Sequence, residues 1–298
     1  MRERLDRRAL LALIGAAVGA GCNGRDPESD TDVTTATPPA TPTATATPPP
    51  AEFRIAYEHP TNVEVGQTVT ITVTVTNTGG RAAAFGASPS VTRPSDTRRT
   101  GPRQELGAIA PGETVTVTSP VYDLDYLGRY TFRFGASAPA TTIRTRPATL
   151  AWDRAYQVPP GYQLRVGAPE LRQTYSYVTP DGIDQERADP GEQWAFVPIE
   201  VANPTDDATT APAADDFTLF PSDTPYDRTA LTEQPIYQGQ PYVATTLQPE
   251  RKHRGYIPYA IPAGSTVDDV RIVWAAPVGG GTVAVSWQSA GLPPYRGD

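Results

Sequence analysis

The sequence has little of three residue types that catalytic and metal sites commonly use. Its 298 residues include one cysteine, one lysine and two histidines. A single cysteine cannot form an internal disulfide, so the folded parts must be stable without cross-links. His59 and His253 have no partner at metal-ligand spacing, and the chain has no nucleophile-elbow or phosphate-loop motif. We therefore expect a protein that is not an enzyme and that needs no cofactor.

The charge balance also excludes one class of partner. The formal net charge is −8, whereas a nucleic-acid-binding protein needs a basic face. An acidic chain with almost no lysine resembles the secreted proteins of extreme halophiles, whose carboxylates keep the surface hydrated in concentrated salt. Codon bias in a GC-rich genome would explain the same composition. Acidic pairs such as Asp206-Asp207 lack the spacing of a calcium loop and fit a solvated surface.

The first 22 residues have the organisation of an export signal. Residues 1–8 are charged, and residues 9–21 are apolar or small and too few to span a bilayer as a permanent helix. The pair Arg7-Arg8 directly precedes this apolar run and resembles a twin-arginine export signal. The ending Gly19-Ala20-Gly21-Cys22 resembles a lipobox. The resemblance implies removal of residues 1–21 and attachment of lipid to Cys22; the alternative is an incidental thiol.

Residues 22–51 form a polar segment whose second half is filled by Thr, Pro and Ala. It has no apolar periodicity, so it cannot bury enough surface to offset the entropy of ordering. We expect a disordered or polyproline-like linker between the lipid anchor and the folded part. Two folded domains should follow, at residues 52–150 and 151–290, with a short tail at 291–298.

The first of these domains shows the alternation of half-buried strands. Val and Thr alternate in residues 65–80 and again in residues 110–120, and each run meets a turn signal. In residues 125–136, an acidic residue, a glycine and Tyr130 resemble the tyrosine corner of immunoglobulin-like sandwiches, with Phe132 in the place of the usual cysteine. The order of these signals resembles the cell-adhesion-related Ig-like modules of archaea and bacteria. The implied fold is an antiparallel β-sandwich in which the Phe132 ring replaces a disulfide.

The second domain repeats these features with more aromatic residues. Its clearest strand lies within residues 191–207, where Pro198 suggests an edge position or a bulge. The series of strands resembles an Ig-like domain of prokaryotic lipoproteins that has no assigned activity. It departs at Gln248-Pro249-Glu250, where that family usually has Pro-Gly. Both domains have an alternating strand that leads to an asparagine, Val73-x-Val75-x-Asn77 and Ile199-x-Val201-x-Asn203, which would fit an ancient duplication. The chain is therefore expected to be all-β, with two consecutive Ig-like sandwiches.

Three aromatic residues, Tyr175, Tyr177 and Trp194, are candidates for a surface that binds a sugar or a protein. Packing in the core would explain the same residues. The expected function is that of a lipoprotein anchored to the membrane through Cys22 on the extracellular face. Its two sandwiches would serve binding, structure or adhesion, with a surface protein or glycan as partner. The alternatives are a solute-binding lipoprotein and an accessory subunit of an enzyme.

Overall fold

The computed structural model describes residues 46–159, 161–236 and 238–297. Arg7, Arg8 and Cys22, with most of the linker, lie outside these residues. The chain from Pro48 onward forms one compact unit. Its regular structure is all β, apart from one short 3-10 helix, η1 (Ala214–Asp216), in the described part. No helix among the described residues is long and apolar enough to cross a membrane.

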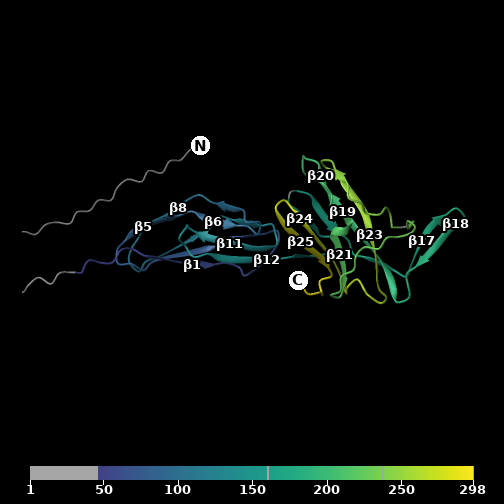
Figure 1. Cartoon of the computed structure of the whole chain (residues 1–298), viewed down its shortest axis with the longest axis horizontal. Coiled ribbons are helices and arrows are strands. Elements are labelled where there is room, and N and C mark those ends of the chain that lie inside the picture. Colours follow the sequence, from purple (N-terminus) through teal and green to yellow (C-terminus); the bar gives the residue numbers. More distant parts are fainter. Residues whose placement is uncertain (1–45, 160, 237, 298) are drawn as a thin grey trace, which may run out of the picture. The chain divides into compact units, whose positions relative to one another are not determined.

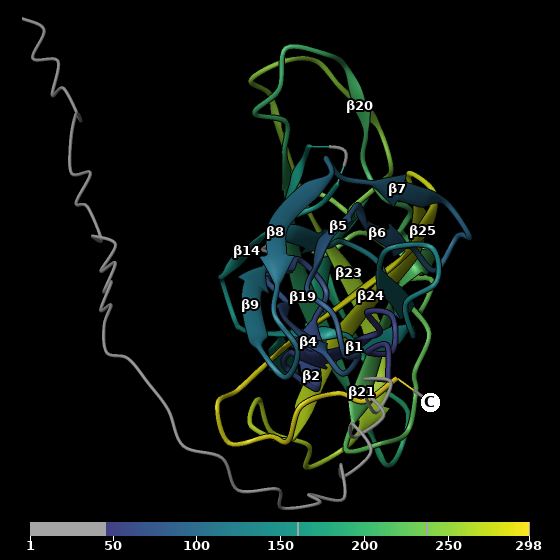
Figure 2. The same ribbon diagram turned by 90° about the vertical axis from the view of Figure 1, so that its left-hand side faces the viewer.

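The first sandwich is built from twelve strands (Figure 1). They are β1 (Phe53–Glu58), β2 (Asn62–Glu64), β3 (Gln67–Val69), β4 (Thr72–Asn77), β5 (Ala83–Ala87), β6 (Pro89–Thr92), β7 (Arg98–Thr100), β8 (Gln104–Ile109), β9 (Thr114–Thr118), β10 (Tyr122–Leu124), β11 (Gly128–Phe134) and β12 (Thr141–Arg146). The two larger sheets have the orders β1-β4-β9 and β2-β12-β11-β6-β7, and β3-β10 and β5-β8 form two-stranded sheets. Figure 2 shows β1 and β4 side by side, in agreement with their antiparallel register.

The Val/Thr alternation explains how these strands make a core. On β4, Val73 and Val75 are buried while Thr72, Thr74 and Thr76 are partly exposed. Successive side chains of a strand point to opposite faces, so this alternation turns all the valines towards the second sheet. They meet the buried rings of β11, and the core of the sandwich lies between the two sheets.

Tyr130 and Phe132 occupy the centre of that core. The backbone N–H of Tyr126 donates to the Tyr130 hydroxyl at 2.9 Å, which is the return contact to nearby backbone expected from the sequence. Burial raises the pKa of Tyr130 to about 12. The Phe132 ring is 2% exposed and packs against Tyr122, with ring centroids 5.2 Å apart. Aromatic packing therefore fills the space between the sheets around Phe132.

The second sandwich contains the remaining thirteen strands. They are β13 (Ala148–Ala151), β14 (Ala155–Gln157), β15 (Gln163–Val166), β16 (Glu170–Arg172), β17 (Thr174–Thr179), β18 (Gly182–Arg187), β19 (Glu192–Ala202), β20 (Thr209–Thr210), β21 (Phe217–Pro221), β22 (Thr246–Leu247), β23 (Lys252–Pro262), β24 (Val270–Val278) and β25 (Gly281–Gln288). One sheet has the order β13-β25-β24-β21. In the facing sheet, β15, which also pairs with β14, and β16 pair with successive halves of one side of β19, and β23 pairs with its other side. β17-β18 and β20-β22 form two-stranded sheets. Trp274 and Trp287, both fully buried, lie in the core with the valines of β19.

Pro198 lies on a central strand, so the expected edge position is wrong, but the register beside it shifts by one residue, as it does at a bulge. β19 pairs along its whole length with β23 on one side. On the other side its partner changes from β15, whose last residue Val166 lies opposite Ile199, to β16, whose first residue Glu170 lies opposite Phe196. Pro198 falls in this gap, where its missing N–H costs no ladder bond. Its carbonyl still accepts from the N–H of Gly167 at 2.9 Å.

The alternating strands that lead to Asn77 and Asn203 end in the same side-chain contacts in both sandwiches. The Asn77 amide donates to the carbonyls of Arg81 and Ile109, at 2.8 and 2.9 Å, and its oxygen accepts from Gly79 N–H. Asn203 makes the equivalent three contacts: its amide donates to the carbonyls of Asp207 and Leu247, and its oxygen accepts from Thr205 N–H. Each asparagine thus fastens the loop after its strand to a distant strand.

A proline turn also recurs in the two sandwiches. Residues 110–113 and 248–251 each form a four-residue turn closed by a bond from the last N–H to the first carbonyl. The third position is left-handed in both: Gly112 has φ of 76° and Glu250 has φ of 59°. The Pro-Glu departure seen in the sequence therefore leaves the turn geometry intact but places a side chain at a position that favours glycine.

Candidate ligand-binding site

The three aromatic candidates do not form an exposed row. Tyr175 is 2% and Trp194 is 7% exposed, and Tyr177 is half-buried, so the surface expected from the sequence is corrected to a small buried cluster. Tyr175 packs edge-on against Trp194 and Phe196, with centroids 5.4 and 5.8 Å apart. Phe196 in turn packs edge-on against Tyr256 of β23. Edge-to-face packing of this kind fixes the rings and removes them from solvent.

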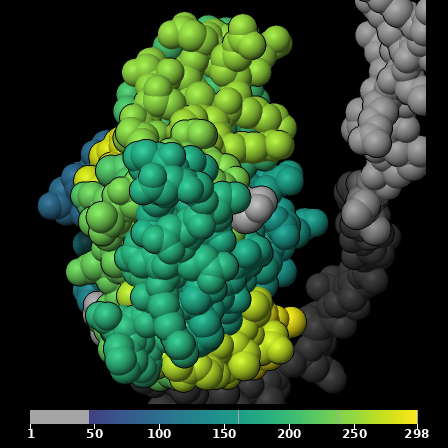
Figure 3. Space-filling model, turned by 90° about the vertical axis from the view of Figure 1, so that its right-hand side faces the viewer, coloured from purple at the N-terminus to yellow at the C-terminus, as the bar shows by residue number. Residues whose placement is uncertain are grey.

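The hairpin of β17 and β18 covers these rings. It extends from the second sandwich in Figure 1, and Figure 3 views the sandwich from the side that carries it. The Tyr175 hydroxyl donates to Glu186 across the hairpin, and burial together with this bond raises the Tyr175 pKa. On the outward side, Val178 and Ile183 are a cross-strand pair that is 64% and 67% exposed.

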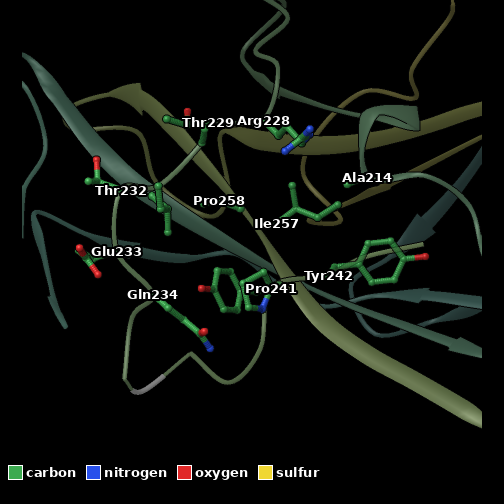
Figure 4. A pocket seen from close by; sticks show the side chains of 13 residues that line it. Ala214, Arg228, Thr229, Thr232, Glu233, Gln234, Pro241, Tyr242, Ile257 and Pro258 are labelled. Carbon is green, nitrogen blue, oxygen red and sulfur yellow. The ribbon is translucent and has the colours of Figure 1, made fainter. Parts of the chain in front are cut away.

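A cavity opens along the free edge of β23, beside this cluster. Two short stretches of chain cover that edge. In one, Tyr242 N–H donates to the carbonyl of Tyr256, whose own N–H donates to the carbonyl of Gln240; in the other, Thr229 N–H donates to the carbonyl of Pro258 at 2.8 Å. Between the two covers lies a cavity of about 400 Å³ (Figure 4). Because proline has no backbone N–H, the uncovered part of the β23 edge at Pro258 contains no unpaired donor from that residue.

The lining combines an apolar floor with a polar rim. The floor is supplied by Leu231, Ile257 and Pro258, and the rim by side chains of the loop that precedes β22. In Figure 4 the loop residues Thr232, Glu233 and Gln234 follow one side of the cavity. Such a surface, apolar beneath and polar at its margin, is the usual construction of a small-molecule site.

One buried polar group of the lining has no partner among the described residues. The Tyr256 hydroxyl lies in a residue that is 3% exposed, yet makes no hydrogen bond. Tyr242, also part of the lining, has its hydroxyl bonded to the carbonyl of Pro212 at 2.9 Å. An unpaired buried hydroxyl costs about 1–3 kcal/mol, which a ligand with a hydrogen-bonding group could recover.

The charged and titratable side chains around the cavity include one ion pair and one histidine. Arg228 forms an ion pair with the exposed Asp215, and the hydrogen bond from its guanidinium lowers the Asp215 pKa. Within the described part of the chain, no three His, Cys, Asp or Glu residues are grouped to hold a metal ion. His253 has a buried, unpaired Nε2 and stacks near Tyr242, with centroids 5.4 Å apart. The other histidine, His59, hydrogen-bonds the hydroxyl of Thr141 and the carbonyl of Pro60.

The cavity depends on the irregular loop at residues 228–234, which carries no sequence signal. The loop is placed by Thr229, whose hydroxyl accepts from Ala260 N–H at 2.9 Å, and by Ile236 N–H, which donates to the carbonyl of Ser176. Both contacts join residues far apart in the sequence. Spacing and composition could not have found them.

Comparisons with known proteins give no family for the chain and one distant structural likeness. No protein-family model matches the chain, and no curated protein sequence matches it. Among solved structures, the chain is similar to an uncharacterized β-sandwich protein from Clostridium difficile 630. The two are 9% identical; the match covers 47% of this chain and 94% of the other, with a TM-score of 0.29. The all-β architecture of the described residues comes from their own strands, and the likeness to that uncharacterized β-sandwich protein is distant.

Proposed function

We propose that the chain is an exported lipoprotein, anchored through Cys22 to the extracellular face of the cell membrane, whose two Ig-like sandwiches bind a partner or ligand. The observation that carries the proposal is the order of segments. The pair Arg7-Arg8, the apolar run and Cys22 are followed by a Thr/Pro-rich segment that leads into a folded unit from Pro48 onward. This is the order expected of an anchor, a spacer and a displayed domain.

The anchor is tested by changing the cysteine. Cys22→Ser should leave the chain either unprocessed or released from membranes, whereas Ser29→Ala, in the same segment, should fractionate as wild type does. Mass spectrometry of the membrane fraction should find a lipid-modified Cys22 at the mature N-terminus. If Cys22→Ser fractionates with membranes at the wild-type mass, the anchor is refuted. Replacing Arg7 and Arg8 with Lys should block export; normal export would point to the general secretory route.

A second candidate function, capture of a small solute, is favoured by the cavity beside β23. Its volume of about 400 Å³ and the unpaired Tyr256 hydroxyl support a ligand with polar groups on an apolar body. A thermal-shift screen of sugars and amino acids should raise the melting temperature of the wild type. Filling the cavity by Leu231→Trp should abolish the shift, and Val178→Trp on the exposed hairpin should not. A shift that survives Leu231→Trp would place the solute elsewhere.

A further inference from the structure

One face of the first sandwich is basic, although the protein as a whole is acidic. Residues 53–147 carry ten arginines and seven carboxylates, whereas residues 148–298 carry ten basic and nineteen acidic side chains. The arginines of the first sandwich are concentrated on the outer face of the sheet β2-β12-β11-β6-β7. The strand alternation puts five of them there: Arg98, Arg129, Arg133, Arg144 and Arg146, all exposed.

The centre of this arginine face is a pair of like charges. Arg129 on β11 and Arg144 on β12 are directly opposite in the antiparallel register. Neither guanidinium has a hydrogen bond or ion pair with any described residue. Like charges directly opposite one another destabilise a sheet. A sequence that keeps two arginines at such a position gains from them only when something anionic lies between them.

The rest of the face supplies hydrogen-bond donors and little negative charge. Thr131 and Thr142 lie in the next cross-strand row, and Asn62 is paired with Arg144. At the face positions of the described strands, Glu64 is the one carboxylate, and Arg146 pairs with it at 3.2 Å. Arg129, Arg144 and Arg146, with Arg296 from the C-terminal segment, also line a cavity of about 400 Å³. The arginine face therefore includes a cavity lined by arginines, and it continues over the sheet to Arg133 and Arg98.

We propose that this arginine face binds an anionic glycan, a polymer that carries sulfate or carboxylate groups on its sugars. Guanidinium groups pair with such oxyanions through two parallel hydrogen bonds, and threonine and asparagine side chains can bond sugar hydroxyls. Neighbouring strands lie about 4.8 Å apart, so arginines on β7, β11 and β12 can engage successive charged groups of one chain. The choice of a polymer outside the cell rests on the proposed function.

Two other polyanions fit the face less well. Binding of single-stranded nucleic acid relies on aromatic side chains for base stacking, and the face positions of this sheet hold no aromatic residue among the described strands. Insertion into a membrane surface needs apolar side chains beside the charges. The residues between the arginines are instead threonine, serine and asparagine.

The opposite face provides a matched control. The outer side of β1-β4-β9 carries Arg54, exposed and opposite Thr76, among threonines and with Glu58 on the same strand. A change from Arg54 to Ala removes the same charge from the same sandwich without touching the arginine face.

The test uses the purified full-length chain and dextran sulfate, with neutral dextran as the blank, at about 0.1 M salt, where exposed charges still interact over roughly 10 Å. The wild type should bind dextran sulfate and not neutral dextran. Arg129→Ala with Arg144→Ala should weaken binding about tenfold, since two exposed charge pairs change affinity about threefold each. Arg54→Ala should change it less than twofold. The double variant should melt no lower than wild type, because it removes a repulsion.

Several outcomes would overturn the proposal. If the double variant and the wild type bind dextran sulfate with equal affinity, the arginine face is not the binding site. If the wild type does not bind dextran sulfate, the proposal is refuted. Binding to phosphatidylglycerol vesicles but not to dextran sulfate would make the occupant a membrane. Competition by inorganic sulfate at an equal concentration of sulfate groups would mean a single-ion site. None of these results depends on Cys22, so failure of the anchor and failure of the glycan site are distinguishable.

Discussion

Replacing Asn203 with alanine should cost the second sandwich about 3 kcal/mol. The side chain is 1% exposed and satisfies three backbone groups: the carbonyls of Asp207 and Leu247 and the N–H of Thr205. Each group left without a partner costs about 1 kcal/mol or more where water cannot replace the bond. Alanine would also leave a small cavity, which adds to the loss.

Tryptophan fluorescence can follow this unfolding in one sandwich alone. The four tryptophans all lie within residues 152–287, and two of them, Trp274 and Trp287, are fully buried. Urea titration of Asn203→Ala should therefore show an earlier fluorescence transition. The equivalent change, Asn77→Ala, should shift part of the circular dichroism signal and leave the fluorescence transition nearly unchanged. The exposed Asn62→Ala should change neither by more than about 0.5 kcal/mol.

A loss below about 1 kcal/mol for Asn203→Ala would refute the reasoning, because it would mean that the three backbone groups find other partners. Asn203→Asp separates the donor and acceptor roles. The aspartate keeps an oxygen for Thr205 N–H but cannot donate to either carbonyl. It should be at least as destabilising as alanine, since it also buries a charge.

The other predictions concern the turns and the buried tyrosine. Glu250→Gly should stabilise the protein by about 0.5–1 kcal/mol, since glycine removes the cost of the left-handed backbone but adds entropy to the unfolded chain. Gly112→Ala should destabilise by about 1–2 kcal/mol through the backbone alone, because a Cβ there would meet nothing within 4 Å; urea midpoints check both. Burial raises the Tyr130 pKa to about 12, so its contribution to stability is complete below pH 10 and lost as the pH rises towards 12. Tyr130→Phe should lower stability at pH 8 but show a smaller decline between pH 10 and 12; an identical decline in both proteins would contradict the assignment.

Much of the fold could be predicted from periodicity because the Val/Thr strands encode which face is buried. Val73 and Val75 are buried, and their threonine neighbours face outward, as a period of two requires. Tyr130 was recognisable because its contact is local, four residues back to Tyr126. Local patterns of this kind are readable in a single sequence.

The errors arose where a residue's position depends on partners distant in the chain. Tyr175 and Trp194 could have been surface or core residues, and the deciding element was the β17–β18 hairpin that folds over them. The central place of Pro198 depends on where β15 ends and β16 begins, which no local pattern encodes. The arginine face was hidden for the same reason, since Arg129 and Arg144 are fifteen positions apart and become neighbours only through strand pairing.

The ring packing around Phe132 has a consequence for where the protein can mature. A sandwich closed by a disulfide reaches its final stability only in an oxidising compartment. This one is closed by Phe132 against Tyr122 and by the Tyr130 contact, none of which responds to redox conditions. Both sandwiches can therefore complete folding in a reducing cytoplasm, which suits the twin-arginine route proposed for the chain. The same independence predicts that reducing agents leave the melting temperature unchanged.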